Sequence, residues 1–393
     1  MHSLTRNTLD HILQKNTEQP GGTPGIVAMV TNQTGNIYEG CAGVRELGKP
    51  QPMSLDTVFG IFSCTKALTA TVAWQLIEEG LLGLDDLARK YIPELANIQV
   101  LEGFDPAGQP ILRFAKNDIT IRHLMLHTAG FGYEFFSEKL LQYLQAQEVP
   151  TIISCTKAAL HAPLLFDPGQ RWEYGINIDW LGQIVETIRG KRLGEIMHER
   201  LFTPLDMMDS DFTMTPACLA KRATIHQRSP ENEMVPQPEL MLPQPPEVDM
   251  GGHGLYATVG DYMKFIRMIL NDGAGSHGRV LKSATVEAMS TNGLGPLKIS
   301  GFKTSISALS NDAEFFPGLS KSWSYSFMVN DEIAPTGRPA GTIGWAGLAN
   351  LFYWIDRRNK IGGFWASQIL PFGDPASFGG YMDFEKTVYQ SIA

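Results

Sequence analysis

The tetrapeptide Ser-Cys-Thr-Lys occurs at residues 63–66 and again at 154–157, and a looser Ser-x-x-Lys lies at 300–303. A serine and a lysine three residues apart share one face of a helix, so the lysine amine can lie within reach of the serine hydroxyl. Such a pair supplies a nucleophile and its base when the serine is accessible, the lysine is desolvated and backbone N–H groups can receive an oxyanion. A strand that leads into a helix N-terminus offers such N–H groups.

The first copy stands at a predicted strand-to-helix junction. Ser63 follows the apolar run 58–62, and apolar residues keep helical spacing after it until Gly80. This helix is apolar on most sides and is expected to be buried, which would desolvate Lys66. We therefore predict that Ser63 is a nucleophile and that Lys66 is its base.

The other two copies lack that context. Ser154 begins a short amphipathic segment that Pro163 ends, so Lys157 is expected to face water. Ser300 lies in a Gly-rich loop with no helix to hold its lysine. A short motif found three times in one chain is weak by itself, and it stays open that all three copies are surface accidents.

Tyr174 is a second candidate for acid–base chemistry. It lies on a short connection between the Asp-Pro-Gly turn at 167–169 and an apolar helical pattern. A tyrosine beside a lysine can share a proton with it, take the proton of a serine hydroxyl and return it to a leaving alcohol. The alternative is that Tyr174 only packs against Trp172 and Trp180.

The order of the predicted elements indicates an α+β protein. Apolar runs with turn residues between them predict β-hairpins at 23–43 and 351–366, whereas helical patterns dominate the middle of the chain. A chain of 393 residues is long enough for two domains. We expect a domain of residues 1–83 and 190–393, built on an antiparallel sheet flanked by helices, with an inserted helical domain of residues 84–189. A site is expected in the cleft between them.

Segments outside the motifs also carry predictions. Helices are expected near the N-terminus, at 259–271 and at 382–392. The Pro-rich stretch 236–247 predicts a long surface loop that could cover the site. The N-terminal pattern lacks the unbroken apolar stretch that an export signal requires.

Charge and cysteine spacing narrow the class of protein. Asp and Glu number 41 against 32 Lys and Arg, and the basic residues are scattered, which argues against nucleic acid or an anionic membrane as a partner. No apolar run is long enough to span a bilayer. The cysteines at 41, 64, 155 and 218 show no CxxC pairing, so we expect reduced thiols in a cytoplasmic protein.

The motifs together resemble the serine β-lactamase and penicillin-binding-protein superfamily. Within it, the chain is most similar to the class C-related carboxylesterases of family VIII and to the fungal monacolin J acyltransferases. The resemblance covers nearly the whole chain and implies a β-lactamase/penicillin-binding-protein-like fold. It rests on Ser63-x-x-Lys66, Tyr174-x-x-Asn177 and the segments 100–105, 120–124, 127–130 and 251–255.

The resemblance also implies a role for each site residue. Ser63 would be the nucleophile, Lys66 and Tyr174 the general-base pair, and the backbone N–H groups of Ser63 and Leu348 the oxyanion hole. The family's Tyr-x-Asn motif is altered, because the asparagine comes one position later. The implied substrate-binding residues are Tyr133, Asn177, Asp179, Trp345 and Gly347.

The third motif of the superfamily, Lys-Thr-Gly, is absent from the chain. The matching strand is 344–348, where Trp345 stands in place of the lysine. An apolar ring removes the charge that binds a substrate carboxylate and favours a neutral acyl or aryl ester. The resemblance therefore implies at most a weak β-lactamase side activity.

The predicted function is a carboxylesterase that hydrolyses short-chain acyl or aryl esters through a serine acyl-enzyme. The partner would be a small-molecule ester, and no metal or cofactor is expected. The alternative is an acyltransferase, in which an alcohol takes the acyl group instead of water. The oligomeric state stays open.

Other functional classes fit less well. His123 and His127 have helical spacing, but the glutamate of an HExxH zinc motif is missing. No G-x-S-x-G elbow of an α/β-hydrolase occurs. Cys64 neighbours the serine and is expected to be a buried, unreactive thiol. A non-catalytic binding protein that kept the fold stays an open alternative.

Overall fold

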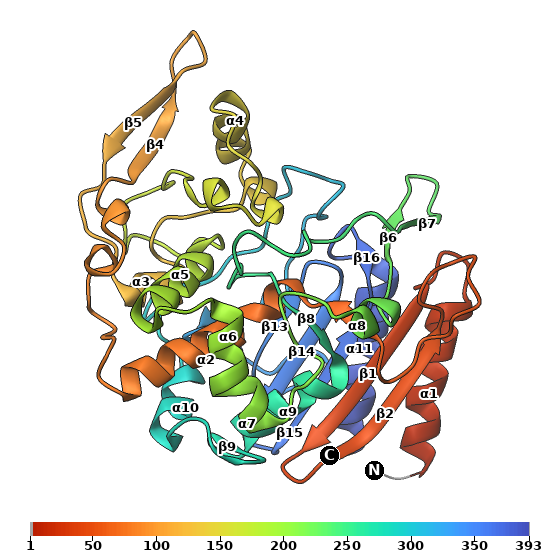
Figure 1. Ribbon diagram of the computed structural model, residues 1–393. Coiled ribbons are helices and arrows are strands. Elements are labelled where there is room, and N and C mark those ends of the chain that lie inside the picture. Colours follow the sequence, from red (N-terminus) through yellow and green to blue (C-terminus); the bar gives the residue numbers. More distant parts are fainter. Residues whose placement is uncertain (1–2, 393) are drawn as a thin grey trace.

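A seven-stranded antiparallel sheet forms the centre of the computed structural model, which describes residues 3–392 (Figure 1). The strand order is β11-β12-β13-β14-β15-β1-β2. Both predicted hairpins are confirmed, and they meet where β15 pairs with β1, with Val27 opposite Ala366. The strands are β1 (Gly25–Asn32), β2 (Asn36–Gly43), β11 (Lys321–Trp323), β12 (Met328–Asn330), β13 (Ile343–Gly347), β14 (Leu351–Asp356) and β15 (Ile361–Ala366).

Helices cover both faces of this sheet. Successive side chains of a strand point to opposite faces. On β14, the Phe352 ring stacks on Tyr381 of α11 (Pro375–Gln390), and the Tyr353 ring packs against Tyr262 of α9 (Val259–Leu270). The predicted helices near the N-terminus and at 259–271 are confirmed as α1 (Ser3–Glu18) and α9.

The C-terminal helix begins earlier than the predicted start at residue 382. Asp374 precedes it, and its carboxylate accepts hydrogen bonds from the N–H groups of Ala376 and Ser377. Pro375 then occupies the first helical position, where a proline loses no hydrogen bond. The small residues Ala376, Ser377, Gly379 and Gly380 in the first turns hid this part of the helix from the apolar pattern.

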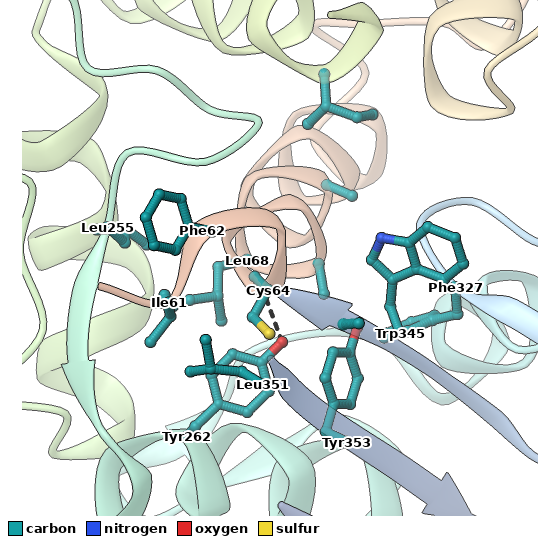
Figure 2. Close-up of a cluster of buried hydrophobic side chains, with 14 of the residues drawn as sticks. Ile61, Phe62, Cys64, Leu68, Leu255, Tyr262, Phe327, Trp345, Leu351 and Tyr353 are labelled. Carbon is teal, nitrogen blue, oxygen red and sulfur yellow. Dashed lines mark hydrogen bonds between the residues drawn. The ribbon is translucent and has the colours of Figure 1, made fainter. Parts of the chain in front are cut away.

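The helix α2 (Thr65–Glu78) is buried along most of its length. It packs against α5 (Asn177–Arg189) and follows the short strand β3 (Val58–Gly60), which pairs with β8 (Tyr256–Thr258). Figure 2 shows side chains at the start of α2 meeting those of α9, β13 and β14 in one apolar cluster. The predicted strand-to-helix junction at residues 58–66 is therefore confirmed.

The segment 84–189, predicted as a mainly helical block, also contains strands. It contains α3 (Ile121–Met125), α4 (Glu138–Ala146) and α5, but also the hairpin of β4 (Gln99–Phe104) and β5 (Pro110–Phe114), which projects from the molecule in Figure 1. The Asp105 carboxylate accepts hydrogen bonds from the N–H groups of Ala107 and Gln109 and so reverses the chain. The division into two domains stays a prediction.

The remaining elements are short. The helices are α6 (Leu193–Met197), α7 (Thr203–Leu205), α8 (Pro216–Ala220) and α10 (Ser283–Met289). The strands are β6 (Ile225–Arg228), β7 (Met234–Gln237), β9 (Ala274–Gly275), β10 (Gly278–Arg279) and β16 (Ile369–Leu370). Within residues 3–392, none of the helices has the length and apolar character that crossing a bilayer demands.

Candidate active site

Ser63 lies in a one-turn 3₁₀ helix between β3 and α2. The preceding Phe62 has a φ of 44°, in the left-handed region that bulky residues rarely adopt. Such backbone strain persists only where the surroundings hold it, and it is frequent at functional sites. The Cys64 carbonyl accepts a hydrogen bond from the Tyr262 hydroxyl at 2.9 Å, drawn as the dashed line in Figure 2. The turn is thus fixed from the side of α9, and Ser63 keeps partial exposure.

Lys66 makes three hydrogen bonds inside the protein. Its Nζ lies 3.1 Å from Ser63 Oγ, 3.0 Å from the Tyr133 hydroxyl and 2.7 Å from the Gly252 carbonyl oxygen. The side chain is fully buried, and burial lowers the pKa of Lys66 to about 7, although Asp179 acts in the opposite direction. A large fraction of the amine is therefore neutral at neutral pH and can accept a proton.

Tyr174 covers the other side of the amine. The face of its ring lies 4.6 Å from Lys66 Nζ, and its hydroxyl accepts a hydrogen bond from Trp345 Nε1 at 2.9 Å. Burial raises the pKa of Tyr174, and hydrogen bonds to Ser63 and Trp345 only partly oppose this effect. The residue is therefore a phenol at neutral pH, suited to passing on a proton. The sequence did not indicate that Trp345 would hold it.

An apolar pocket opens in front of Ser63. It encloses about 530 Å³ including its mouth. The predicted residues Tyr133, Tyr174, Trp345, Gly347 and Leu348 line it together with Ser63. The other lining residues are Phe62, Phe135, Phe136, Ile152, Ile153, His253, Phe302, Phe315, Ala346 and Phe372.

The Pro-rich stretch 236–247 does not line this pocket, so the prediction that it covers the site is wrong. The Gln244 side chain hydrogen-bonds the backbone of Phe212 and Met214 instead, which holds the loop elsewhere. Phe302 and Phe315 line the pocket where the Pro-rich stretch was expected, and both come from the irregular segment that follows α10.

Asn177 and Asp179 lie behind the pocket rather than in it. Asn177 Nδ2 lies 2.9 Å from His127 Nδ1 and donates to the Phe131 carbonyl at 3.4 Å, so its side chain braces the loop before Tyr133. Neither residue lines the pocket. The start of α5 turns both side chains into the core, and the substrate-binding roles of Asn177 and Asp179 stay predictions.

Asp179 reaches the site through the glycine pair at 251–252. Its Oδ1 accepts a hydrogen bond from the Gly252 N–H at 2.8 Å, and the carbonyl of the same glycine accepts from Lys66. A Cβ on Gly252 would lie 2.3 Å from Asp179 Oδ2, so only glycine permits this approach. The next residue, His253, lines the pocket and was not among the predicted site residues. The sequence drew attention to residues 251–255, which include His253, only as part of the resemblance to the superfamily.

The structure separates the other candidates from the site. The Cys64 side chain is fully buried and points among Leu68, Leu351 and Tyr262 in Figure 2, and burial raises the pKa of its thiol. Lys303 is 87% exposed and pairs with Asp312 at 2.6 Å. In the part of the chain that the structure describes, no cluster of three or more His, Cys, Asp or Glu side chains could hold a metal ion.

Comparisons with known proteins identify the family and the fold. The family model "Beta-lactamase" matches residues 10–381. ML-236A carboxylate methylbutanoyltransferase mlcH from Penicillium citrinum is 29% identical over 94% of this chain and 91% of its own. Lovastatin esterase from Penicillium rubens is 31% identical over 89% and 90%. The structure of simvastatin synthase (LovD) from Aspergillus terreus is similar with a TM-score of 0.85 at 27% identity, covering 98% of each chain.

Proposed function

Because the chain belongs to the Beta-lactamase family and has the fold of its serine acyl-enzymes, we propose that it is an acyltransferase. It would move a short acyl group from an ester or thioester to the alcohol of an apolar acceptor through an acyl-Ser63 intermediate. The sequence favoured a carboxylesterase over this alternative. Relatives that cover most of the chain include a methylbutanoyltransferase as well as an esterase, and further relatives are named acyltransferases.

The observation that carries the proposal is the contact between Lys66 and Ser63. A fully buried amine with a lowered pKa, 3.1 Å from a partly exposed hydroxyl, is a base in contact with a nucleophile. Ser63 lines the apolar pocket, where the acyl chain would bind, and Lys66 lies buried directly behind it.

In the first step, Ser63 Oγ attacks the carbonyl carbon of the donor while Lys66 Nζ takes the hydroxyl proton. The backbone N–H groups of Ser63 and Leu348 would receive the oxyanion. When the tetrahedral intermediate collapses, the bond to the leaving group breaks, and Tyr174 returns a proton to that group, relayed from Lys66. The products are the acyl ester of Ser63 and the free alcohol or thiol.

In the second step, the acceptor hydroxyl attacks the acyl-enzyme and gives its proton to the same base. The new ester forms as the bond to Ser63 Oγ breaks, and the serine recovers its proton. The lining of the pocket favours an apolar acceptor over water, since it contributes a wall of phenylalanine, isoleucine and tryptophan side chains. Trp345 places an uncharged ring where the superfamily has a lysine, and this replacement also supports uncharged ligands.

The test is a partition experiment with p-nitrophenyl butyrate as the acyl donor. The purified protein is incubated with and without cyclohexanol, and butyrate and cyclohexyl butyrate are measured by gas chromatography. We expect cyclohexyl butyrate to form, with p-nitrophenol release that rises with cyclohexanol concentration. A Ser63→Ala variant controls for uncatalysed transfer.

Hydrolysis is the second candidate function, because lovastatin esterase is 31% identical over 89% of this chain. Butyrate as the sole acyl product at every cyclohexanol concentration, together with dependence on Ser63, would favour the esterase and overturn the transferase. Retained turnover in Ser63→Ala would overturn both. Weak cleavage of β-lactams stays a prediction and can be measured with nitrocefin in the same preparation.

A further inference from the structure

A buried set of charged groups lies directly behind Lys66. Asp179 and His253 face each other, with 3.5 Å between Oδ1 and Nδ1, and both side chains are almost completely buried. Asp179 contacts Gly252 through the backbone N–H, and the same glycine contacts Lys66 through its carbonyl. One carboxylate therefore stands between two groups that can carry a positive charge.

The remaining titratable neighbours of His253 come from two other elements. Cys155 Sγ lies 3.7 Å from His253 Nε2, at the end of the 3₁₀ turn at 152–154. Glu134, from the 3₁₀ turn after Tyr133, is buried, accepts a hydrogen bond from the Ile152 N–H at 3.2 Å and has its pKa raised by burial.

A buried carboxylate needs a compensating charge, because taking an unpaired charge out of water costs several kcal/mol. Asp179 Oδ2 and His253 Nδ1 have no hydrogen-bond partner in the described residues, so the compensation is the charge of whichever neighbour, His253 or Lys66, carries the proton. Burial disfavours protonation of His253, yet its contacts with Asp179 and Cys155 outweigh this and raise its pKa to about 9. Lys66 and His253 thus compete for one carboxylate.

We propose that His253 is a positioning residue for the base of the acyl transfer: as the protonated partner of Asp179, it satisfies that carboxylate and leaves the Lys66 amine neutral. The inference rests on the proposed roles of Ser63 and Lys66. His253 does not touch the reacting atoms in this account. It acts through Asp179 and the glycine that Asp179 holds.

The direction of the effect follows from the competition. If His253 is replaced by an uncharged side chain, Lys66 becomes the only cation beside Asp179, and the attraction favours its protonated form. Lys66 is then protonated at neutral pH and can act as a base only at higher pH, where it loses that proton. Removing the Asp179 charge has the opposite effect, because nothing then holds the proton on Lys66.

The experiment measures the pH profile of kcat/KM for p-nitrophenyl butyrate in His253→Gln, Asp179→Asn and the double variant. In His253→Gln we expect the acid limb to move up by about one pH unit or more, with about tenfold less activity at pH 7 and recovery at alkaline pH. Asp179→Asn keeps an acceptor oxygen for Gly252, and in this variant the acid limb should move to lower pH. The upward shift should vanish in the double variant, since His253 acts through Asp179.

A matched control is His226→Gln. His226 is also buried, but it accepts a hydrogen bond from the Leu47 N–H at 3.1 Å and does not line the active-site pocket. This variant should keep the acid limb of the wild type. Thermal melting of each variant separates loss of folded protein from a change in the base.

A His253→Gln profile that is lowered equally at every pH would overturn the inference and leave His253 a packing residue. The same holds if the upward shift persists in the double variant. Failure of the proposed function gives a different result, namely turnover that survives Ser63→Ala. Turnover without Ser63 would thus overturn the proposed function, whereas an acid limb that does not move in His253→Gln would overturn only the role of His253.

Discussion

In the first Ser-Cys-Thr-Lys segment, Cys64 has φ −62° and ψ −20°, whereas in the second the matching Cys155 has φ 51° and ψ 35°. Right-handed geometry at Cys64 lets the chain continue into α2, so that Lys66 returns to within 3.1 Å of Ser63. Left-handed geometry at Cys155 ends the turn at once. Ser154 then bonds Thr156, with 3.0 Å between their hydroxyl oxygens.

Burial separates the two segments further. Lys66 is fully buried among groups that its amine can bond, whereas Lys157 is exposed. The Lys157 amine therefore lacks the desolvation that lowers the pKa of Lys66. The tetrapeptide supplies the groups, but a continuous helix and a buried environment turn them into a nucleophile and its base.

The largest expected effect is at the nucleophile. Ser63→Ala should lower kcat/KM for p-nitrophenyl butyrate by about 10⁴-fold or more, because no acyl-enzyme can form. Ser154→Ala should retain activity within about twofold, since its hydroxyl is outside the pocket. Equal losses in the two variants would show that Ser63 is not the sole nucleophile.

The next effect is at the base. Lys66→Ala should reduce kcat/KM by about 10³-fold through loss of general-base catalysis, and Lys157→Ala should leave it nearly unchanged. Steady-state kinetics at pH 8 give both values, and circular dichroism checks that the variants fold. A Lys66→Ala enzyme with nearly full activity would show that the short contact to Ser63 has no role in the chemistry.

Tyr174→Phe should have a smaller effect, about 10²-fold in kcat/KM, because it removes the proton relay but keeps the ring against Lys66. Tyr143→Phe is the matched control, since Tyr143 lies on α4 and does not line the pocket. The second Ser-Cys-Thr-Lys segment has no such tyrosine in the pocket, so a loss in Tyr174→Phe would be a further difference between the two segments. Equal activity of the two variants would contradict the proposed relay.

The pH dependence gives the smallest effect. Lys66 acts as a base only when neutral, so activity should fall as the pH drops through its pKa of about 7. Between pH 8 and pH 6 the neutral fraction, and with it kcat/KM, should decrease about tenfold. An acid limb near pH 4 instead would indicate that a carboxylate is the base.

The sequence predicted the parts of the fold that local patterns encode. Short apolar runs on either side of polar turns specified the hairpins β1–β2 and β14–β15, and the apolar spacing after Ser63 specified α2. The hairpin β4–β5 escaped prediction because its strands are largely half-buried or exposed and lack a clear apolar alternation.

The site residues likewise fall into those that a local motif predicts and those that it does not. Ser63, Lys66 and Tyr174 could be named from their motifs, but the inward position of Asn177 and the links to Asp179 and His253 depend on packing between distant segments. Gly252 and Asp179 are 73 residues apart in the chain. No local pattern encodes a contact over such a separation, although the glycine pair at 251–252 does indicate a close backbone approach.

The most direct test of the account is covalent labelling. The purified protein is treated with a fluorophosphonate probe, digested and mapped by mass spectrometry, beside the Ser63→Ala and Ser154→Ala variants. We predict one modified serine, Ser63, with labelling that disappears in Ser63→Ala and persists in Ser154→Ala. A label on Ser154, or labelling that survives in Ser63→Ala, would contradict the claim that helix context and burial select the nucleophile.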